Sequence, residues 1–367
     1  MLDFGNHQIH EPPSRRLERK VRAMRPKATW LPAPGFVFQE ASGVTPAKEF
    51  GDPLGLVLDY FKSRLLGPNR VKNGAFETGS DWVFGNGWSI SGGVAQRGGS
   101  GGGHLDQADV FEVGKTYLVT VKIQGIEVFP RSMANTNIFP GGRIATDGTH
   151  TARFTADSTG LRFYSGSGSG HIDSVEVREI PGVPLRQPNA NSRPTLGIEP
   201  GNGPRSIRFD GIDDFLDATG LTAASGPKTV IAGCRTDDGE TGVNEFLFDA
   251  RVGRVLAAAV GSSAGQAGMY DGSWTAGGEY DTEAKAVLTF KHYAAGGGIR
   301  ANGAEILTEN VVEKPFGGSV TVGANFSVSG GFLDGRIYVM LVFDRALTAL
   351  EIWICERWVA QIMGEIL

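Results

Sequence analysis

Apolar and polar residues alternate at period two through much of the chain between residues 70 and 180. The clearest runs are KTYLVTVKIQGI (115–126) and HIDSVEVREI (171–180). Alternation of this kind is typical of β-strands that bury one face and expose the other. Turn residues recur about every ten positions, a spacing that favours an antiparallel sandwich over a parallel α/β sheet. We therefore predict a jelly-roll sandwich over residues 70–180.

The same pattern returns over residues 205–367, in runs such as KTVIAGCRT (228–236) and GRIYVMLVFD (335–344). Only the last twenty residues change period. Thr348 and Glu351 have the spacing of a helix capping box. Apolar residues then recur every four positions, which predicts a helix stripe facing a core: Leu350, Ile354, Trp358, Ile362 and Ile366. We predict a second sandwich, closed by one amphipathic helix.

Residues 1–69 and 181–204 lack this alternation. Prolines between Pro26 and Pro53 make a long helix implausible and favour an extended N-terminal arm. The stretch 181–204 is again rich in proline and is predicted to be a linker. The fold class is therefore mainly β, with an arm at 1–69, sandwiches at 70–180 and 205–367, and a linker between them.

A basic cluster lies at the start of this arm. It comprises Arg15, Arg16, Arg19, Lys20, Arg22, Arg25 and Lys27. Two interpretations stay open, a short solvated helix and a docking arm for an acidic surface of a partner protein. Nucleic acid is disfavoured because the aromatic residues lie outside the basic cluster rather than within it.

Composition narrows the classes of function. The 367 residues include 54 glycines, which suits many tight turns, and the net charge of −5 gives no case for nucleic-acid or membrane binding. No apolar run reaches the roughly 18 residues that span a bilayer, and the N-terminus has no signal-peptide core. We expect synthesis in a host cytoplasm. Cys234 and Cys355 are expected to be buried thiols.

The chain shows little sign of catalytic chemistry. Residues 261–265 (GSSAG) fit the nucleophile-elbow pattern, but no helix pattern follows them. The acids Asp210, Asp213, Asp214 and Asp217 are best explained as turn residues that cap their own backbone, with calcium binding as the alternative. We expect no enzymatic activity, no catalytic residues, no metal and no cofactor, apart from that calcium alternative.

Sugar binding by a β-sandwich uses aromatic faces against the apolar side of a pyranose, with polar side chains on its hydroxyls. Exposed-looking aromatic residues of both sandwiches are therefore candidates for binding glycans. They are Trp82, Tyr164, Tyr270, Trp274 and Tyr280, together with Asp271 in the same turn-rich stretch.

The stretch Leu54–Arg97, with LGPNRVKNG at 66–74, resembles a module common in structural proteins of tailed bacteriophages. In that module a short lead precedes a jelly roll like those of galactose-binding and family-4/9 carbohydrate-binding modules. The segments at 114–125 and 171–182 resemble its central and closing strands. Residues 206–219, 270–275 and 332–352 are similar to concanavalin A-like, laminin-G-type sandwiches.

The resemblance implies a component of the virion surface, such as a head spike, a head or tail fibre or a tail decoration. Its N-terminal part would bind other virion proteins (capsid, portal or tail), and its sandwiches would contact host cell-surface polysaccharide. Phage fibres are commonly homo-oligomers such as trimers, so we expect the same here. Two alternatives remain: a glycan-binding accessory module of a bacterial surface protein, and a polysaccharide depolymerase.

Overall fold

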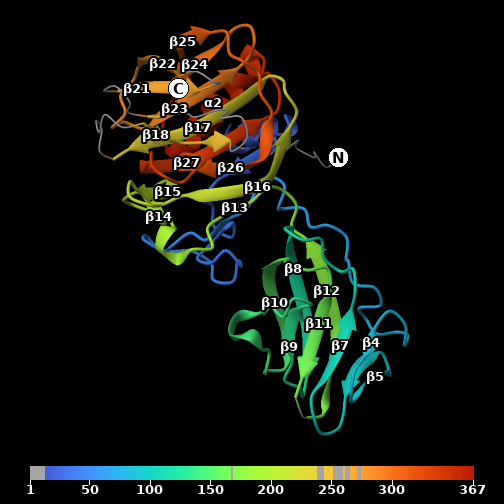
Figure 1. Cartoon of the computed structure of the whole chain (residues 1–367). Coiled ribbons are helices and arrows are strands. Elements are labelled where there is room, and N and C mark those ends of the chain that lie inside the picture. Colours follow the sequence, from blue (N-terminus) through green and yellow to red (C-terminus); the bar gives the residue numbers. More distant parts are fainter. Residues whose placement is uncertain (1–12, 167, 238–243, 251–258, 261–264, 271–273) are drawn as a thin grey trace, which may run out of the picture. The chain divides into compact units, whose positions relative to one another are not determined.

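The computed structural model describes residues 13–166, 168–237, 244–250, 259–260, 265–270 and 274–367 (Figure 1). The chain divides into two compact units. The middle unit comprises Pro34–Lys48 and Pro53–Ala190, and the C-terminal unit comprises Met1–Ala33, Glu49–Asp52 and Asn191–Leu367. Strands dominate both units, and an α-helix lies near the C-terminus, which confirms the predicted fold class.

The middle unit contains two antiparallel sheets. The order of the five-stranded sheet is β10 (Gly148–Thr155), β8 (Thr116–Gln124), β12 (Gly170–Glu179), β6 (Val94–Arg97) and β5 (Trp88–Ser91). The order of the four-stranded sheet is β4 (Val83–Phe84), β7 (Gly103–Gln107), β11 (Leu161–Ser165) and β9 (Phe129–Ser132). Short elements complete the unit: β2 (Val37–Phe38), β3 (Leu56–Val57), β13 (Leu185–Arg186) and the 3₁₀ turn η1 (Pro140–Gly142).

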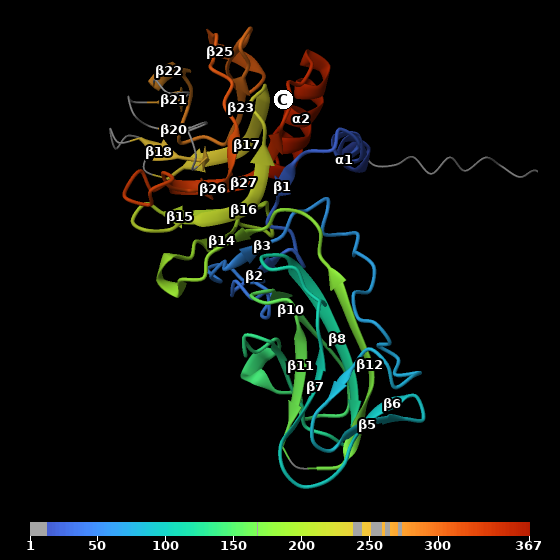
Figure 2. The same cartoon turned by 45° about the vertical axis from the view of Figure 1, so that its right-hand side comes forward.

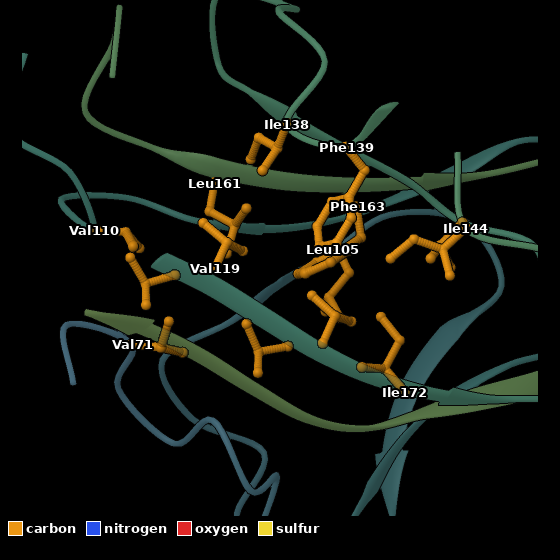
Figure 3. Packing of buried hydrophobic residues seen from close by; sticks show 14 of the residues in the cluster. Val71, Leu105, Val110, Val119, Ile138, Phe139, Ile144, Leu161, Phe163 and Ile172 are labelled. Atoms are coloured by element: carbon orange, nitrogen blue, oxygen red, sulfur yellow. The ribbon is translucent and has the colours of Figure 1, made fainter. Parts of the chain in front are cut away.

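The core of the middle unit is built from both sheets. Leu105 and Phe163 of the four-stranded sheet point toward Val119 and Ile172 of the five-stranded sheet in one apolar cluster (Figure 3). All four side chains are at most 1% exposed. Because strand side chains alternate between the two faces of a sheet, burial of these positions directs their chain neighbours outward.

The C-terminal unit is built on one large antiparallel sheet. Its order is β14 (Thr195–Ile198), β15 (Arg205–Asp210), β27 (Asp334–Phe343), β17 (Lys228–Thr236), β23 (Ala286–His292), β24 (Gly297–Ala301) and β25 (Ala304–Glu309), and β1 (Ala28–Trp30) also pairs with β27. Two further groups of strands belong to the unit. One is β19 (Asp249–Ala250), β26 (Phe316–Val322) and β16 (Leu216–Ala223); the other is β18 (Glu245–Phe246), β20 (Ala259–Val260), β21 (Gln266–Tyr270) and β22 (Trp274–Glu279).

Two helices pack together in the C-terminal unit, as Figure 2 shows. The helix α2 (Ala349–Met363) begins with the predicted capping box of Thr348 and Glu351. The helix α1 (Pro13–Ala23) lies beside it, and Met24 just after α1 places its sulfur 3.6 Å from that of Cys355. A 3₁₀ turn, η2 (Ala190–Ser192), precedes β14.

The predicted apolar stripe of α2 is wrong at its two ends. Leu350 is 65% exposed and Ile366 is 94% exposed, whereas Ile354 and Trp358 are buried as expected. The helix lies against both α1 and the sheet, so its buried surface is broader than one stripe and also includes the line through Cys355 and Val359. A four-residue spacing alone does not reveal that second contact.

Two further local predictions are confirmed, the hairpin turn at Asn302 and Gly303 and the burial of both cysteines. Asn302 and Gly303 have positive φ values of 48° and 85° and join β24 to β25 in a two-residue hairpin. Cys234 and Cys355 are buried and form no disulfide. Among the described residues no helix has the length and apolar character needed to cross a membrane.

Candidate functional site

The outer face of the four-stranded sheet in the middle unit carries an aromatic row. The antiparallel register places Tyr164 of β11 opposite His104 of β7 on one side and opposite Phe129 of β9 on the other. The neighbouring residues Leu105 and Phe163 are fully buried, so the three rings must point away from the core. We call His104, Tyr164 and Phe129 the aromatic rung.

The rings of this rung form a continuous surface across three strands. The centroids of Tyr164 and His104 are 5.1 Å apart, and those of Tyr164 and Phe129 are 5.8 Å apart, with tilted planes. Tyr164 and Phe129 are half-buried and His104 is exposed. A Cβ atom at Gly102 would lie 2.5 Å from the Tyr164 hydroxyl, so glycine at that position leaves space for the ring.

A charged row lies two residues along the same strands. Asp106, Arg162 and Arg131 are directly opposite one another on β7, β11 and β9, and we call them the charged rung. Arg162 donates from Nε and Nη2 to the two oxygens of Asp106, at 3.0 and 2.7 Å. This bidentate hydrogen bonding raises the pKa of Arg162. The pair fixes a donor and acceptor group beside the rings.

Arg131 has a different environment from Arg162. Its guanidinium carbon lies 5.6 Å from the ring centroid of Phe129, a cation–π contact. Its Nε atom is buried and has no hydrogen-bond partner among the described residues. The hairpin after β9 returns alongside the strand, where the amide of Ile138 donates to the carbonyl of Pro130 at 3.0 Å. Arg131 therefore lies between two chain segments with part of its donor capacity unused.

The edge strand β4 borders this face. Val83 pairs with Asp106 and is 68% exposed, so it extends the charged rung with an apolar side chain. Aromatic rings, an arginine–aspartate pair and a second arginine thus lie side by side on a solvent-facing sheet surface. Such a surface can stack against a planar or ring-shaped ligand and hydrogen-bond its polar substituents.

Of the predicted glycan-binding residues, Tyr164 lies at the centre of this face and Trp82 does not belong to it. Trp82 is 5% exposed and donates from its indole nitrogen to the carbonyl of Asn73 at 3.1 Å. Its ring packs against Phe76 and Phe163 at centroid distances of 5.3 and 6.2 Å. The ring of Trp82 is thus a core element with no face open to a ligand.

The remaining candidates belong to the C-terminal unit. Tyr270 is half-buried at the end of β21, opposite Trp274 of β22, and Asp271 lies outside the described residues, as does the side chain of Trp274. Tyr280 has a buried hydroxyl, and desolvation by burial raises its pKa well above the usual value. Its polar end therefore faces the interior.

The predicted docking residues lie in α1 and just after it. Six of them have exposed side chains: Arg15, Arg16, Arg19, Lys20, Arg22 and Arg25. Lys27 differs, because it is half-buried and its ammonium lies 3.4 Å from the carboxylate of Asp344. The helix interpretation of the basic cluster is confirmed for Pro13–Ala23.

The acidic cluster lies in the turn after β15. Carboxylate oxygens of Asp210, Asp213 and Asp214 lie within 4.8 Å of one another. One oxygen of Asp210 accepts the amides of Ile212 at 2.9 Å and of Asp213 at 3.4 Å, so the predicted capping of the turn by its own aspartate is confirmed. Asp217 instead accepts the hydroxyl of Thr321 at 2.8 Å in β26.

A cavity of about 300 Å³ adjoins this turn. Its lining residues are Asn191, Arg193, Thr195, Arg208, Phe209, Asp210 and Asp214. Burial raises the pKa of Asp214 to about 7, and the nearby charges of Asp210 and Asp213 add to the shift. This carboxyl is therefore partly protonated at neutral pH, a property that sequence alone does not reveal.

The aromatic and charged rungs include residues that the sequence analysis missed: His104, Phe129, Asp106, Arg162 and Arg131. The alternation of GHLDQ (103–107) and LRFYS (161–165) contains a usable signal, because it places His104, Asp106, Arg162 and Tyr164 outward. It does not show which strands are neighbours, and that pairing is what brings these residues together.

The matches to known proteins come from solved structures. No family model matches the chain, and no curated protein matches it. Among solved structures, the Trypanosoma rangeli sialidase with the inhibitor DANA matches at 10% identity, 76% of this chain, 63% of that chain and a TM-score of 0.39. The Ruminococcus gnavus IT-sialidase CBM40 bound to α2,3-sialyllactose matches at 16% identity, 35% of this chain, 81% of that chain and a TM-score of 0.29.

The NanB sialidase from Streptococcus pneumoniae matches at 18% identity, 35% of this chain, 24% of that chain and a TM-score of 0.29. The chain spans less than two thirds of the length of both sialidases. At these identities and TM-scores, no ligand or activity carries over to this chain from the matched structures.

The expectation that the protein has no enzymatic activity is nevertheless corrected by this comparison. Several of the matched structures are sialidases, which are glycosidases, so we withdraw that expectation. It rested on a search for local motifs. A glycosidase site can be assembled from carboxyl groups that lie far apart in the sequence, and a motif search does not detect such sites.

Proposed function

We propose that the middle unit binds carbohydrate on the outer face of its four-stranded sheet. The observation that carries the proposal is the aromatic rung lying directly beside the charged rung on a solvent-facing surface. One side of a pyranose presents C–H groups that stack on aromatic rings, and its hydroxyls accept and donate hydrogen bonds at the edges. Tyr164 supplies the central ring, and Arg162 with Asp106 supplies paired donors and acceptors.

The composition of this face supports a binding role over a purely structural one. Three rings on the solvent side contribute nothing to the core beneath them, because the core is filled by the alternate residues such as Leu105 and Phe163. Contiguous apolar surface with a polar border is typical of interaction sites. The resemblance of this unit to phage jelly rolls similar to carbohydrate-binding modules agrees with the same assignment.

The test is a binding measurement on the full chain with a glycan array, followed by calorimetry on the glycans retained. Tyr164→Ala should weaken binding about tenfold or more, because stacking area at the centre of the site is lost. Trp353→Ala is the matched control, since Trp353 is an aromatic residue 48% exposed on α2 of the other unit. Equal glycan affinity of the wild-type and Tyr164→Ala proteins would show that the glycan does not bind on this face.

The same glycans should be assayed for release of reducing ends. Intact glycan after prolonged incubation agrees with a binding role. Steady release of reducing ends by the wild-type chain would instead indicate a polysaccharide depolymerase. The variant Asp214→Asn then indicates whether the partly protonated carboxyl beside the 300 Å³ cavity takes part in cleavage.

We further propose that the protein is displayed on a bacteriophage particle and attached through its N-terminal region. Support comes from the resemblance over residues 54–97 and from the six exposed basic side chains around α1, which suit an acidic partner surface. Gold-labelled antibody against this chain should decorate intact particles in electron micrographs. Absence of label on particles that contain the protein in denaturing gels would contradict surface display.

A further inference from the structure

We propose that the ligand of this face is an acidic saccharide whose carboxylate is held by Arg131. The inference rests on the proposed carbohydrate-binding function and specifies its ligand class. It starts from the difference between the two arginines of the charged rung, since Arg162 has a carboxylate partner and Arg131 has none among the described residues.

The pairing of β9 with β11 explains why the lack of a carboxylate partner at Arg131 matters. Arg131 and Arg162 are directly opposite on neighbouring antiparallel strands, an arrangement that places their Cβ atoms about 4.5–5.5 Å apart. Like charges at directly opposite positions repel one another. Asp106 has one negative charge and hydrogen-bonds Arg162, so it balances one of the two cations. The charged rung therefore has one cation in excess.

The position of Arg131 suits a bound anion. The ring of Phe129 lies against the guanidinium, and the returning hairpin runs alongside the same strand. Its Nε atom is closed to solvent, so a carboxylate would be held by the two terminal nitrogens of the planar guanidinium, through two parallel hydrogen bonds. A sugar stacked on Tyr164 and Phe129 would bring a carboxylate substituent within reach of those donors. A neutral sugar would leave the charge uncompensated.

The test uses acidic polysaccharides, each compared with its own carboxyl-reduced form. Polygalacturonate, alginate, hyaluronate and a sialylated oligosaccharide supply carboxylates in different ring positions, and dextran sulfate supplies charge without a carboxylate. We expect at least one carboxylated ligand to bind, and its reduced form to bind at least tenfold more weakly. Raising the ionic strength should weaken the binding of the acidic ligand and leave the binding of its reduced form unchanged.

Variants locate the effect on Arg131. Arg131→Gln should lose about tenfold in affinity for the acidic ligand and leave affinity for the reduced form unchanged, whereas Tyr164→Ala should weaken both. Arg131→Lys should recover part of the loss, because it keeps the charge without the planar fork. Arg143→Gln is the control, since Arg143 is an exposed arginine of the same unit paired with Glu127 at 3.2 Å. Thermal unfolding of each variant verifies folding.

The outcomes distinguish the ligand class from the binding function itself. Equal binding of an acidic glycan and its reduced form, lost in Tyr164→Ala, would overturn the acidic ligand class and leave the carbohydrate-binding function in place. Preference for dextran sulfate over every carboxylated ligand would overturn the carboxylate assignment. Binding of none of these ligands and none on the glycan array would overturn both proposals.

Discussion

The middle unit has two outward-facing sheet surfaces, and their side chains differ in kind. On the five-stranded sheet, Thr120 lies opposite Thr151 on one side and Glu176 on the other. The equivalent row on the four-stranded sheet is the aromatic rung, centred on Tyr164. Both sheets cover the same core, so solvation alone would permit the same residues on each. The contrast supports the proposal that the aromatic surface serves binding rather than folding.

The most decisive test of this contrast compares two neighbouring residues of one strand, one expected to stabilise the fold and the other to bind the ligand. Phe163 and Tyr164 are adjacent in β11 but face opposite sides of the sheet. Phe163→Ala should cost about 3–5 kcal/mol of unfolding free energy, because it leaves a cavity in the core. Tyr164→Ala should cost less than about 1 kcal/mol, as is usual for substitutions at the surface.

Urea titrations of the two variants measure these losses, and calorimetry with a bound glycan measures affinity. The comparison requires the two effects to separate, with Phe163→Ala affecting stability and Tyr164→Ala affecting affinity. A stability loss of similar size in both variants would show that the aromatic rung is part of the fold, and would leave the binding role without its main support.

The comparison also requires that the acidic turn of the C-terminal unit be unconnected with binding on the middle unit. The pKa of Asp214 is about 7 in the folded protein and near 3.8 in the unfolded chain. Between these values the folded state retains a proton that the unfolded state has released, so stability falls as pH rises from 4 to 7. Asp214→Asn removes this loss, which is at most about 4 kcal/mol.

We therefore expect Asp214→Asn to exceed the wild-type stability at pH 8 and to match it near pH 4, in urea titrations at both values. The amide oxygen can still accept the Asp210 backbone amide that the carboxylate accepts. Glycan affinity should not change. A variant less stable than wild type at pH 8 would mean that the charged form of Asp214 is stabilised in the folded protein, for example by a cation bound among the three aspartates.

Much of the fold follows from local sequence signals. Alternation marks strands such as β8 and β12, the Asn302–Gly303 pair marks a hairpin, and the spacing of Thr348 and Glu351 marks the start of α2. Each of these features depends on residues close in sequence. Local physics determines them, because turn geometry and capping involve only neighbouring backbone groups.

The proposed binding face depends on contacts that local sequence signals do not predict. His104, Phe129 and Tyr164 come from three strands, and only the register of β7, β9 and β11 brings them together. Sequence reasoning selected Tyr164 and also Trp82, because both are aromatic residues in strand-rich surroundings. It could not distinguish them, since Trp82 lies just before the short strand β4, where alternation is too brief to indicate which way its ring points.

A charge change sharpens the contrast between the two arginines of the face. Asp106→Asn removes the carboxylate that engages Arg162 and leaves two cations uncompensated. Affinity for an acidic glycan should rise about three- to tenfold at low salt, and the gain should fade above about 0.3 M salt as screening shortens the range of the charges. Calorimetry at two ionic strengths measures both. A fall in affinity at low salt would mean that Asp106 itself contacts the ligand.

The smallest expected effect is on the opposite sheet. Thr120→Ala removes a surface hydroxyl that lies 3.5 Å from that of Thr151, at the limit of hydrogen bonding. Stability should change by less than about 0.5 kcal/mol, the usual range for a surface substitution away from special features. Glycan affinity should remain within twofold of wild type. A tenfold loss of affinity in Thr120→Ala would show that the ligand also contacts the five-stranded sheet, so that the aromatic rung would no longer distinguish the two surfaces.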